Sequence, residues 1–216
     1  MKKIAILLAL GGGCLAAPAL AQDESTFTGP RVEGIIGYDI TKAGSSTPTT
    51  TQDKSIDGLL YGVGAGFDIA AGNLVIGAEG EFTDSTAKTS FDNAPAGIFG
   101  LGRVNTGRDL YVGARIGVRA SPHMLIYAKG GYTNARYHIL ASNGTTQLDD
   151  SVDADGWRLG AGAELATSEH TFAKLEYRYS NYTKGEIDFP ASIPDSQRFN
   201  LDTDRHQIVA AVGFRV

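Results

Sequence analysis

The chain has 216 residues and a formal net charge of −5, and 42% of its residues are apolar and 20% charged. Glycine is frequent at 28 residues, and there is one cysteine. This composition excludes a collagen-like protein, a coiled coil and a small disulfide-stapled domain. With 19 basic against 24 acidic residues, the chain has no basic excess to neutralise phosphates, so nucleic acid is not an expected partner.

A cleavable secretory signal peptide is expected over residues 1–21. Lys2 and Lys3 form a basic start, residues 4–10 are an unbroken apolar run, and Ala19–Ala21 is a small-x-small cleavage site. A lipoprotein signal cleaved before Cys14 is the alternative, but Gly11 stands where such a signal favours leucine. Cleavage leaves residues 22–216, which contain no cysteine and no apolar stretch of the ~20 residues that a membrane helix needs.

The mature chain shows strand periodicity and no convincing helical pattern. Apolar and polar residues alternate with a period of two in eight runs, as expected of strands with one apolar face. The runs are Arg31–Ile40, Gly58–Ile69, Leu74–Phe82, Asp109–Arg119, Met124–Asn134, Gly156–Leu165, Thr171–Tyr179 and Arg205–Val216.

The connections between these runs alternate strictly in length. Three are tight (70–73, 120–123 and 166–170), and four are long and polar (41–57, 83–108, 137–155 and 180–204). The long loops therefore share one end, and the tight turns share the other end with both termini. Transmembrane barrels have this layout, with short periplasmic turns and long extracellular loops. We predict an all-β, eight-stranded antiparallel up-and-down transmembrane β-barrel over residues 22–216.

One face of the runs carries almost all of their charge. The acids and bases on this face are nearly equal in number. Such a balance suits an interior of ion pairs, because a buried unpaired ion costs several kcal/mol. Glycine gathers on the same face, where it makes room for long side chains in a narrow barrel. We therefore expect this face to line the lumen and the apolar face, with the tyrosines and Trp157 near its edges, to contact lipid. The charged face holds Glu33, Asp39, Asp68, Glu79, Glu81, Asp109, Glu164, Glu176, Arg31, Arg115, Arg119, Lys129, Arg158, Lys174, Arg178, Arg205 and Arg215.

The candidate site residues form a luminal charge network that fills the interior with ion pairs. An eight-stranded barrel encloses space only wide enough for side chains, so the network is expected to leave no continuous water path. Its expected members are Arg31, Glu33, Glu79, Glu81, Arg115, Arg119, Lys129, Arg158, Glu164, Lys174, Glu176, Arg178 and Arg215.

Three stretches carry a resemblance to a known family: Leu125–Tyr132, Gly156–Glu164 and Lys174–Tyr179. With the signal peptide and the eight runs, the mature chain resembles the small outer-membrane β-barrel family of surface antigens, related to opacity proteins and the OmpA barrel. The resemblance implies a Gram-negative outer-membrane protein that contacts outer-membrane lipid, lipopolysaccharide and the barrel-assembly machinery. That machinery reads an aromatic residue at the end of the family's chains, whereas Phe214 here stands two residues before the end.

No group of residues makes a convincing catalytic or cofactor site. Asp202, Asp204 and His206, together with Asp149 or Asp150, could be drawn as a hydrolase set, but acids are common in long surface loops. A divalent cation prefers oxygen ligands, but a solvated acidic loop is the better explanation of the acids Asp149, Asp150, Asp153 and Asp155. We expect no enzyme activity, metal or cofactor.

The leading functional hypothesis is a surface-exposed structural barrel that supports envelope integrity and presents its loops to other molecules. A narrow porin-like channel is the main alternative, because the luminal glycines leave room for water. A membrane-embedded hydrolase and a soluble periplasmic barrel are the remaining alternatives. The chain does not reveal whether a host molecule or peptidoglycan is contacted.

Overall fold

The computed structural model describes residues 26–43, 55–90, 100–142, 147–188 and 199–216. The expected signal peptide lies outside these residues and stays a prediction. Among the described residues, no helix is long and apolar enough to span a membrane. The strands are β1 (Gly29–Ala43), β2 (Ser55–Ala71), β3 (Leu74–Ser85), β4 (Lys88–Ser90), β5 (Gly100–Ser121), β6 (Met124–Ser142), β7 (Gln147–Ala166), β8 (Thr171–Asp188) and β9 (Phe199–Arg215).

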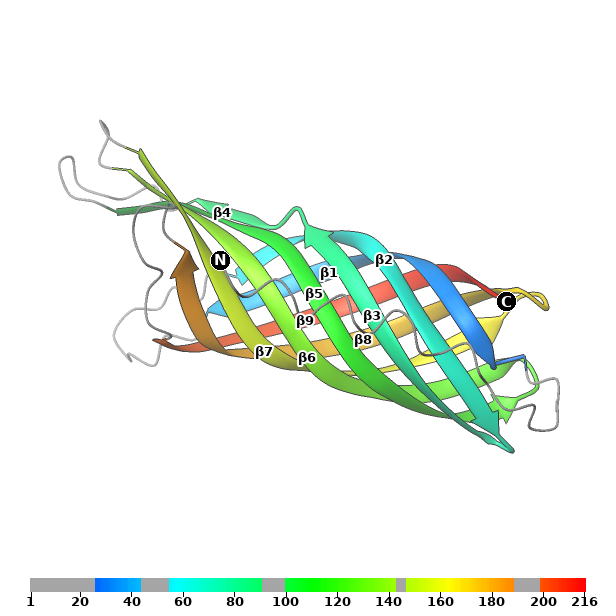
Figure 1. Ribbon diagram of the computed structural model, residues 1–216. Coiled ribbons are helices and arrows are strands. Elements are labelled where there is room, and N and C mark those ends of the chain that lie inside the picture. The colour runs from blue at the N-terminus through cyan, green and yellow to red at the C-terminus, as the bar shows by residue number, and fades with distance from the viewer. Residues whose placement is uncertain (1–25, 44–54, 91–99, 143–146, 189–198) are drawn as a thin grey trace.

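These strands close into one antiparallel barrel (Figure 1). Each strand pairs with its neighbours in the chain, β1 pairs with β9, and β3 pairs with β5. β3 and β4 form one stave that is interrupted at Thr86 and Ala87, and both segments pair with β5. Across the interruption, Thr86 keeps its hydrogen bonds to Leu59 of β2. The barrel therefore has eight staves, which confirms the predicted fold.

The strands reach further toward the loop end than the apolar pattern predicts. β6 continues to Ser142 although its period-two pattern ends at Asn134, and β7 begins at Gln147 instead of Gly156. Backbone pairing continues in these segments although apolar residues no longer alternate with polar ones. The period-two pattern therefore does not predict these strand ends. Much of three of the connections that were expected to be long loops, 83–108, 137–155 and 180–204, is therefore strand.

Tight turns join the strands at the opposite end, as predicted. Gly72 and Asn73 alone separate β2 from β3, and the φ of +60° at Gly72 lies in the left-handed region that favours glycine. The chain also returns to this end, where the Val216 amide donates to the carbonyl of Pro30 at 3.1 Å. The tight turns among the described residues therefore lie at one rim of the barrel (Figure 1). The start of β1 and the end of β9 lie at the same rim.

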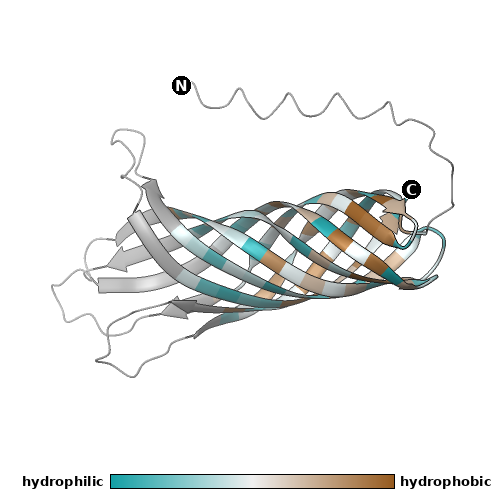
Figure 2. Ribbon diagram, turned by 90° about the horizontal axis from the view of Figure 1, so that it is seen from below, coloured by the Kyte–Doolittle hydropathy of each residue, from teal (hydrophilic) through white to brown (hydrophobic). Residues whose placement is uncertain are grey.

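The two faces of the wall are inverted relative to those of a soluble protein. Val212 and Leu175 point outward with exposed fractions of 69% and 61%, whereas Arg158 and Arg178 point inward and have 0%. Apolar and polar residues alternate along the staves in Figure 2. Such an outward apolar band suits lipid, because apolar area of this extent is not stable in water.

Glycines on the inner face give room to the charged side chains, as expected. A Cβ added to Gly77 would lie 2.0 Å from Oδ1 of Asp68, and one added to Gly66 would lie 2.8 Å from a guanidinium nitrogen of Arg31. Real Cβ atoms do not approach so closely, so larger residues would displace these charged groups.

The prediction for the tyrosines was right in part. Trp157 and Tyr132 do face outward, with exposed fractions of 42% and 49%. Tyr111, Tyr127 and Tyr182 instead lie inside the barrel with at most 3% exposed. Their rings pack beside the luminal cations, as where the Nζ of Lys129 lies 4.7 Å from the Tyr111 ring centroid.

Candidate functional site

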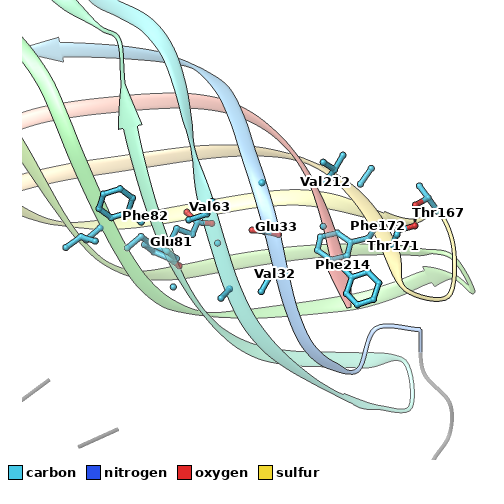
Figure 3. A pocket seen from close by; sticks show the side chains of 18 residues that line it. Val32, Glu33, Val63, Glu81, Phe82, Thr167, Thr171, Phe172, Val212 and Phe214 are labelled. Carbon is cyan, nitrogen blue, oxygen red and sulfur yellow. Dashed lines mark hydrogen bonds between the residues drawn. The ribbon is translucent and has the colours of Figure 1, made fainter. Parts of the chain in front are cut away.

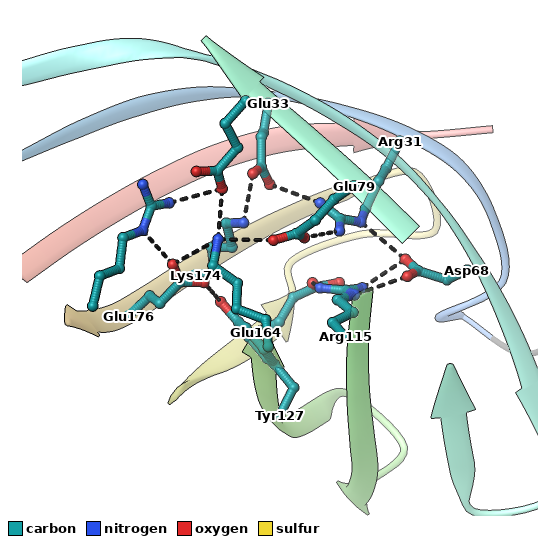
Figure 4. Close-up of polar contacts among 12 residues, drawn as sticks. Arg31, Glu33, Asp68, Glu79, Arg115, Tyr127, Glu164, Lys174 and Glu176 are labelled. Atoms are coloured by element: carbon teal, nitrogen blue, oxygen red, sulfur yellow. Dashed lines mark hydrogen bonds and ion pairs between the residues drawn. The ribbon is translucent and has the colours of Figure 1, made fainter. Parts of the chain in front are cut away.

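The lumen is filled by three tiers of ion pairs, and the first lies toward the tight turns. Its centre is Asp68, which accepts hydrogen bonds from Arg31 at 3.0 Å, from Arg115 at 2.8 and 2.6 Å and from Arg215 at 3.0 Å. Glu164 accepts from the same Arg115 at 2.7 Å and from Arg215 at 2.8 Å. We call this group the turn-end tier (Figure 4).

Arg31 connects the turn-end tier to the next level. Besides Asp68, its guanidinium contacts Glu33 at 3.2 Å and also donates to Glu79. Glu33 in turn accepts from the Nζ of Lys174 at 2.5 Å (Figure 4). These contacts join strands β1, β3 and β8 across the lumen.

Lys129 is the centre of the middle tier. Its Nζ lies 2.7 Å from Glu79, 2.7 Å from Glu81 and 2.9 Å from Glu176. Arg178 donates to Glu81 at 2.9 Å and also to Glu176. Each carboxylate of this tier is therefore shared between cations from more than one strand.

The loop-end tier is built on Asp109. It accepts from Arg158 at 2.5 Å, from Arg205 at 2.6 Å, from Thr133 at 2.7 Å and from the hydroxyl of Tyr182 at 3.0 Å. Arg205 also grips Asp39 with two hydrogen bonds of 2.8 and 2.6 Å, so this tier reaches from β5 to β1.

The charges of the three tiers balance. Among the described residues, the buried acids are Glu33, Asp39, Asp68, Glu79, Glu81, Asp109, Glu164 and Glu176, and the buried bases are Arg31, Arg115, Lys129, Arg158, Lys174, Arg178, Arg205 and Arg215. Removing one partner of such a network leaves an uncompensated buried charge, which costs about 3–5 kcal/mol. The lumen is therefore a set of interlocked pairs that tolerates little change.

The candidate residues fall almost entirely into these tiers. Arg119 is the exception, because it is only half-buried and donates to the backbone carbonyl of Gly72 at the turn rim. The expected network omitted Asp39, Asp68, Asp109 and Arg205, although Asp68 and Asp109 make the most connections of their tiers. It also missed the luminal tyrosines. Tyr111 could have been found, because it lies two residues from Asp109 and therefore on the same face.

An apolar residue lies at the mouth of the barrel at the tight-turn end. Phe27, just before β1, is fully buried and packs with Val75, Leu125 and Tyr127 of the inner wall. The guanidinium of Arg215 lies 5.7 Å from its ring centroid. The turn-end tier therefore has an apolar cover on the side of this mouth.

Some buried polar atoms of the lumen have no hydrogen-bond partner among the described residues. They include one guanidinium nitrogen each of Arg158 and Arg178, a carboxylate oxygen of Glu81 and the hydroxyl of Tyr111. Nη1 of Arg158 and Oε2 of Glu81 lie 3.8 Å apart, close enough for an ion pair but too far for a hydrogen bond. These atoms link the middle and loop-end tiers by charge alone.

Two residues that were weighed as part of a hydrolase set, Asp204 and His206, lie on the outer wall near the loop end. Asp204 accepts hydrogen bonds from Tyr179 at 2.6 Å and Asn181 at 3.0 Å, and these bonds hold the pKa of its carboxyl below the ordinary value. His206 contacts the hydroxyl of Tyr177 at 2.7 Å and does not contact the lumen. The side chain of Asp202 lies outside the described residues.

The four acids that were weighed as a cation site are described only in part. Asp153 is held by a two-point contact with Arg136 at 2.7 and 2.6 Å, and Asp155 accepts from Tyr132 and Asn134. The side chains of Asp149 and Asp150 lie outside the described residues. Among the side chains that are described, no three acidic, histidine or cysteine residues gather as a metal site.

A closed barrel with a paired lumen, an outward apolar band and tight turns at one rim defines the class of outer-membrane β-barrel proteins. The chain matches the outer membrane protein beta-barrel domain over residues 5–215 and belongs to that family. This places it in the outer membrane and excludes the soluble periplasmic alternative.

Two relatives and one solved structure illustrate the likeness. The chain is 28% identical over 199 residues to the 25 kDa outer-membrane immunogenic protein of Brucella abortus, covering 92% of this chain and 84% of the relative. It is 30% identical over 140 residues to the 31 kDa outer-membrane immunogenic protein of Brucella melitensis, covering 62% of this chain and only 58% of that relative. Neisserial surface protein A shares the fold with a TM-score of 0.54 at 12% identity, covering 88% of this chain and 98% of that chain.

Proposed function

We propose that this protein is a non-conducting surface barrel, which supports the envelope and presents its extracellular segments to other molecules. The observation that carries this proposal is the filling of the lumen by three tiers of buried ion pairs. Pairs that cross between opposite strands, such as Arg205 of β9 with Asp109 of β5 and Arg178 of β8 with Glu81 of β3, occupy the space that a pore would need.

The relatives support a role at the cell surface. Both are named as outer-membrane immunogenic proteins, which fits a protein that presents segments outside the cell. In the present chain, the paired strands β5, β6 and β7 continue beyond the outward apolar band on the loop side. They form a support for exposed segments, and we propose no enzymatic reaction for them.

A narrow channel is the second candidate, and the unpartnered luminal atoms favour it. Arg158, Arg178, Glu81 and Tyr111 each have a buried polar atom that water could satisfy. A continuous row of water molecules through the lumen would have to pass both Phe27 and the turn-end tier, whose cations are held by Asp68 and Glu164. We therefore place this function second.

A deletion strain separates the two candidates in the cell. If the barrel is closed and supports the envelope, its loss makes cells sensitive to detergent and leaves the uptake of small hydrophilic solutes unchanged. Expression of the wild-type protein restores resistance, whereas Ala161→Arg, which is expected to destabilise the inserted barrel, restores it less. A fall in solute uptake in the deletion strain, with normal detergent resistance, would contradict the proposal.

A further inference from the structure

The outer wall carries an apolar groove of about 1080 Å³ that runs from the tight-turn rim toward the loop end (Figure 3). It begins at Thr167 and Thr171, at the turn between β7 and β8, and ends at Phe82 and Leu110. Because barrel strands are tilted, a row of neighbouring outward residues that crosses the strands also moves along the barrel axis. The groove therefore starts at the rim of the tight turns and extends into the outward apolar band.

The register of the strands places the groove on two adjacent rows of outward residues. One row joins, by direct cross-strand pairing, Ala173, Val212, Gly34, Val63, Phe82 and Leu110. The other row joins Thr171, Phe214, Val32, Ala65 and Gly80. Small residues in both rows form the floor between larger neighbours. A Cβ added to Gly34 would meet no atom within 4 Å, and one added to Gly80 would meet only a backbone oxygen at 3.7 Å, so this floor is open toward the outside.

Polar groups are confined to one end of the groove. Of the outward residues that line it, only Thr167 and Thr171 are polar. Glu33 and Glu81 border the groove from the luminal face of the wall, where cations of the tiers hold them. The length of the groove therefore suits a hydrocarbon chain, and its start at the tight-turn rim suits a polar group attached to that chain.

Three hydroxyl groups are linked at this polar end. Oγ of Ser168 accepts from the backbone amides of His170 at 3.3 Å and of Thr171 at 3.1 Å. Both of its lone pairs are then used, so it donates its own proton to Oγ1 of Thr171, which lies 2.7 Å away. Oγ1 of Thr171 lies 2.8 Å from Oγ1 of Thr167. Whichever threonine donates to the other, one hydroxyl proton of the pair is left for an acceptor outside the turn, and the linked hydroxyls polarise it.

The same turn supplies a second donor and an acid. The ring of His170 packs on Phe214, which lines the groove, with the ring centroids 5.6 Å apart. An imidazole carries at least one N–H donor in either protonation state. Glu169 precedes His170 in the turn and is exposed. Donors for an anionic group therefore lie beside a carboxylate for a cationic group, which is the complement of a zwitterion.

We infer that this groove binds one glycerophospholipid of the periplasmic leaflet with a zwitterionic, ammonium-bearing headgroup, that is, phosphatidylethanolamine. An acyl chain lies over Gly34, Ala65 and Gly80. The threonine pair and His170 donate to the phosphate, and Glu169 faces the ammonium. The periplasmic leaflet is the source because the polar end lies at the tight turns, which are the periplasmic end of such a barrel. The inference rests on the outer-membrane location and holds whether or not the lumen conducts.

The test measures the binding of phosphatidylethanolamine to the refolded mature chain in detergent micelles, by native mass spectrometry. The double variant Thr167→Val and Thr171→Val should lower the affinity by about fivefold, as for one lost hydrogen bond. Gly80→Leu should also lower the affinity, because the new side chain fills the floor of the groove. The open space at Gly80 lets this variant fold, so it remains informative if the turn does not tolerate the valines.

The headgroup is tested with phosphatidylglycerol, which carries the phosphate but no ammonium. The wild type should bind phosphatidylethanolamine more tightly than phosphatidylglycerol. Glu169→Gln should reduce this preference by about threefold, as for one exposed ion pair. Equal affinity of the wild type for the two lipids, or an unchanged preference in Glu169→Gln, would overturn the assignment of the headgroup.

Two matched controls separate this groove from general lipid contact. Ser121→Ala removes a hydroxyl at the turn between β5 and β6, and Ala163→Leu enlarges an outward residue of β7 that does not line the groove. Both should bind phosphatidylethanolamine as the wild type does. Wild-type affinity in either folded groove variant would overturn the inference, as would an equal loss in Ala163→Leu. Heat-modifiable gel mobility shows which variants are folded. Conductance, which tests the proposed function, does not depend on these outward residues.

Discussion

Arg115 and Asp68 form a two-point ion pair between strands β5 and β2, which are separated by β3 in the barrel wall. Nε of Arg115 lies 2.8 Å from one carboxylate oxygen and Nη2 lies 2.6 Å from the other. Asp68 also accepts from Arg31 and Arg215, so a single carboxylate holds three guanidinium groups. This pair shows how the chain can place charges inside a barrel of only eight staves.

Replacing Asp68 should therefore strongly destabilise the barrel. Asp68→Ala leaves Arg31, Arg115 and Arg215 with too little negative charge, and we expect the free energy of unfolding to fall by about 3–5 kcal/mol. Urea unfolding in lipid vesicles, followed by heat-modifiable gel mobility, measures this loss. Arg119→Ala, outside the tiers, is the control and should cost less than about 1 kcal/mol. Equal losses in the two variants would contradict the network.

Phe27 should contribute to stability more than to closure. Phe27→Ala removes a fully buried ring from the contacts with Val75, Leu125 and Tyr127, and such truncations cost about 3 kcal/mol. The ion pairs of the turn-end tier remain in place, so the variant should still not conduct. Vesicle unfolding and planar-bilayer recording test the two parts. Steady open events in Phe27→Ala would show that the ring, and not the charge tiers, closes the lumen.

The outward face should reject charge. Ala161 lies in the middle of the outward apolar segment of β7, between Leu159 and Leu165, so Ala161→Arg places a cation in the hydrocarbon region. We expect a loss of about 2–4 kcal/mol in vesicle refolding. Ala161→Leu is the matched control and should fold as the wild type does. Harmless insertion of Ala161→Arg would mean that the two faces are inverted.

The stability of the loop-end rim, outside the apolar band, should depend weakly on pH in the acid range. The hydrogen bonds from Tyr179 and Asn181 lower the pKa of Asp204, so they stabilise the fold above the ordinary carboxyl pKa. This contribution is lost as the pH falls through the lowered pKa. Tyr179→Phe should raise the pKa of Asp204 toward its ordinary value, as measured by carbon-13 NMR titration. An unchanged titration midpoint would contradict the role of the hydroxyl.

Residue alternation was enough to predict the fold and the side of the wall on which charges lie. It could not predict which charges pair, because partners such as Arg205 and Asp39 are distant in sequence and meet only when the barrel closes. For the same reason, Arg119 was grouped with the network although it binds a turn carbonyl. Arg119 lies on the same face of its strand as the luminal charges, but at the rim of the barrel. Residue alternation indicates the face on which a side chain lies and not its position along the barrel axis.

Other features had no sequence signal of this kind. Phe27 precedes the first alternating run, so nothing in the local pattern indicated that it would fold into the barrel mouth. The pairing of small outward residues depends on the register between strands, which places Ala65 beside Gly80. Register is set by closure and turn geometry, and a single strand does not show it.

The closed lumen is the central claim, and single-channel recording tests it most directly. The mature chain is refolded, inserted in planar bilayers and recorded over a range of salt concentrations. We predict no steady open events for the wild type at any salt concentration at which it stays folded. Reproducible, steady conductance of the folded wild-type protein would contradict the account and would establish a narrow channel instead.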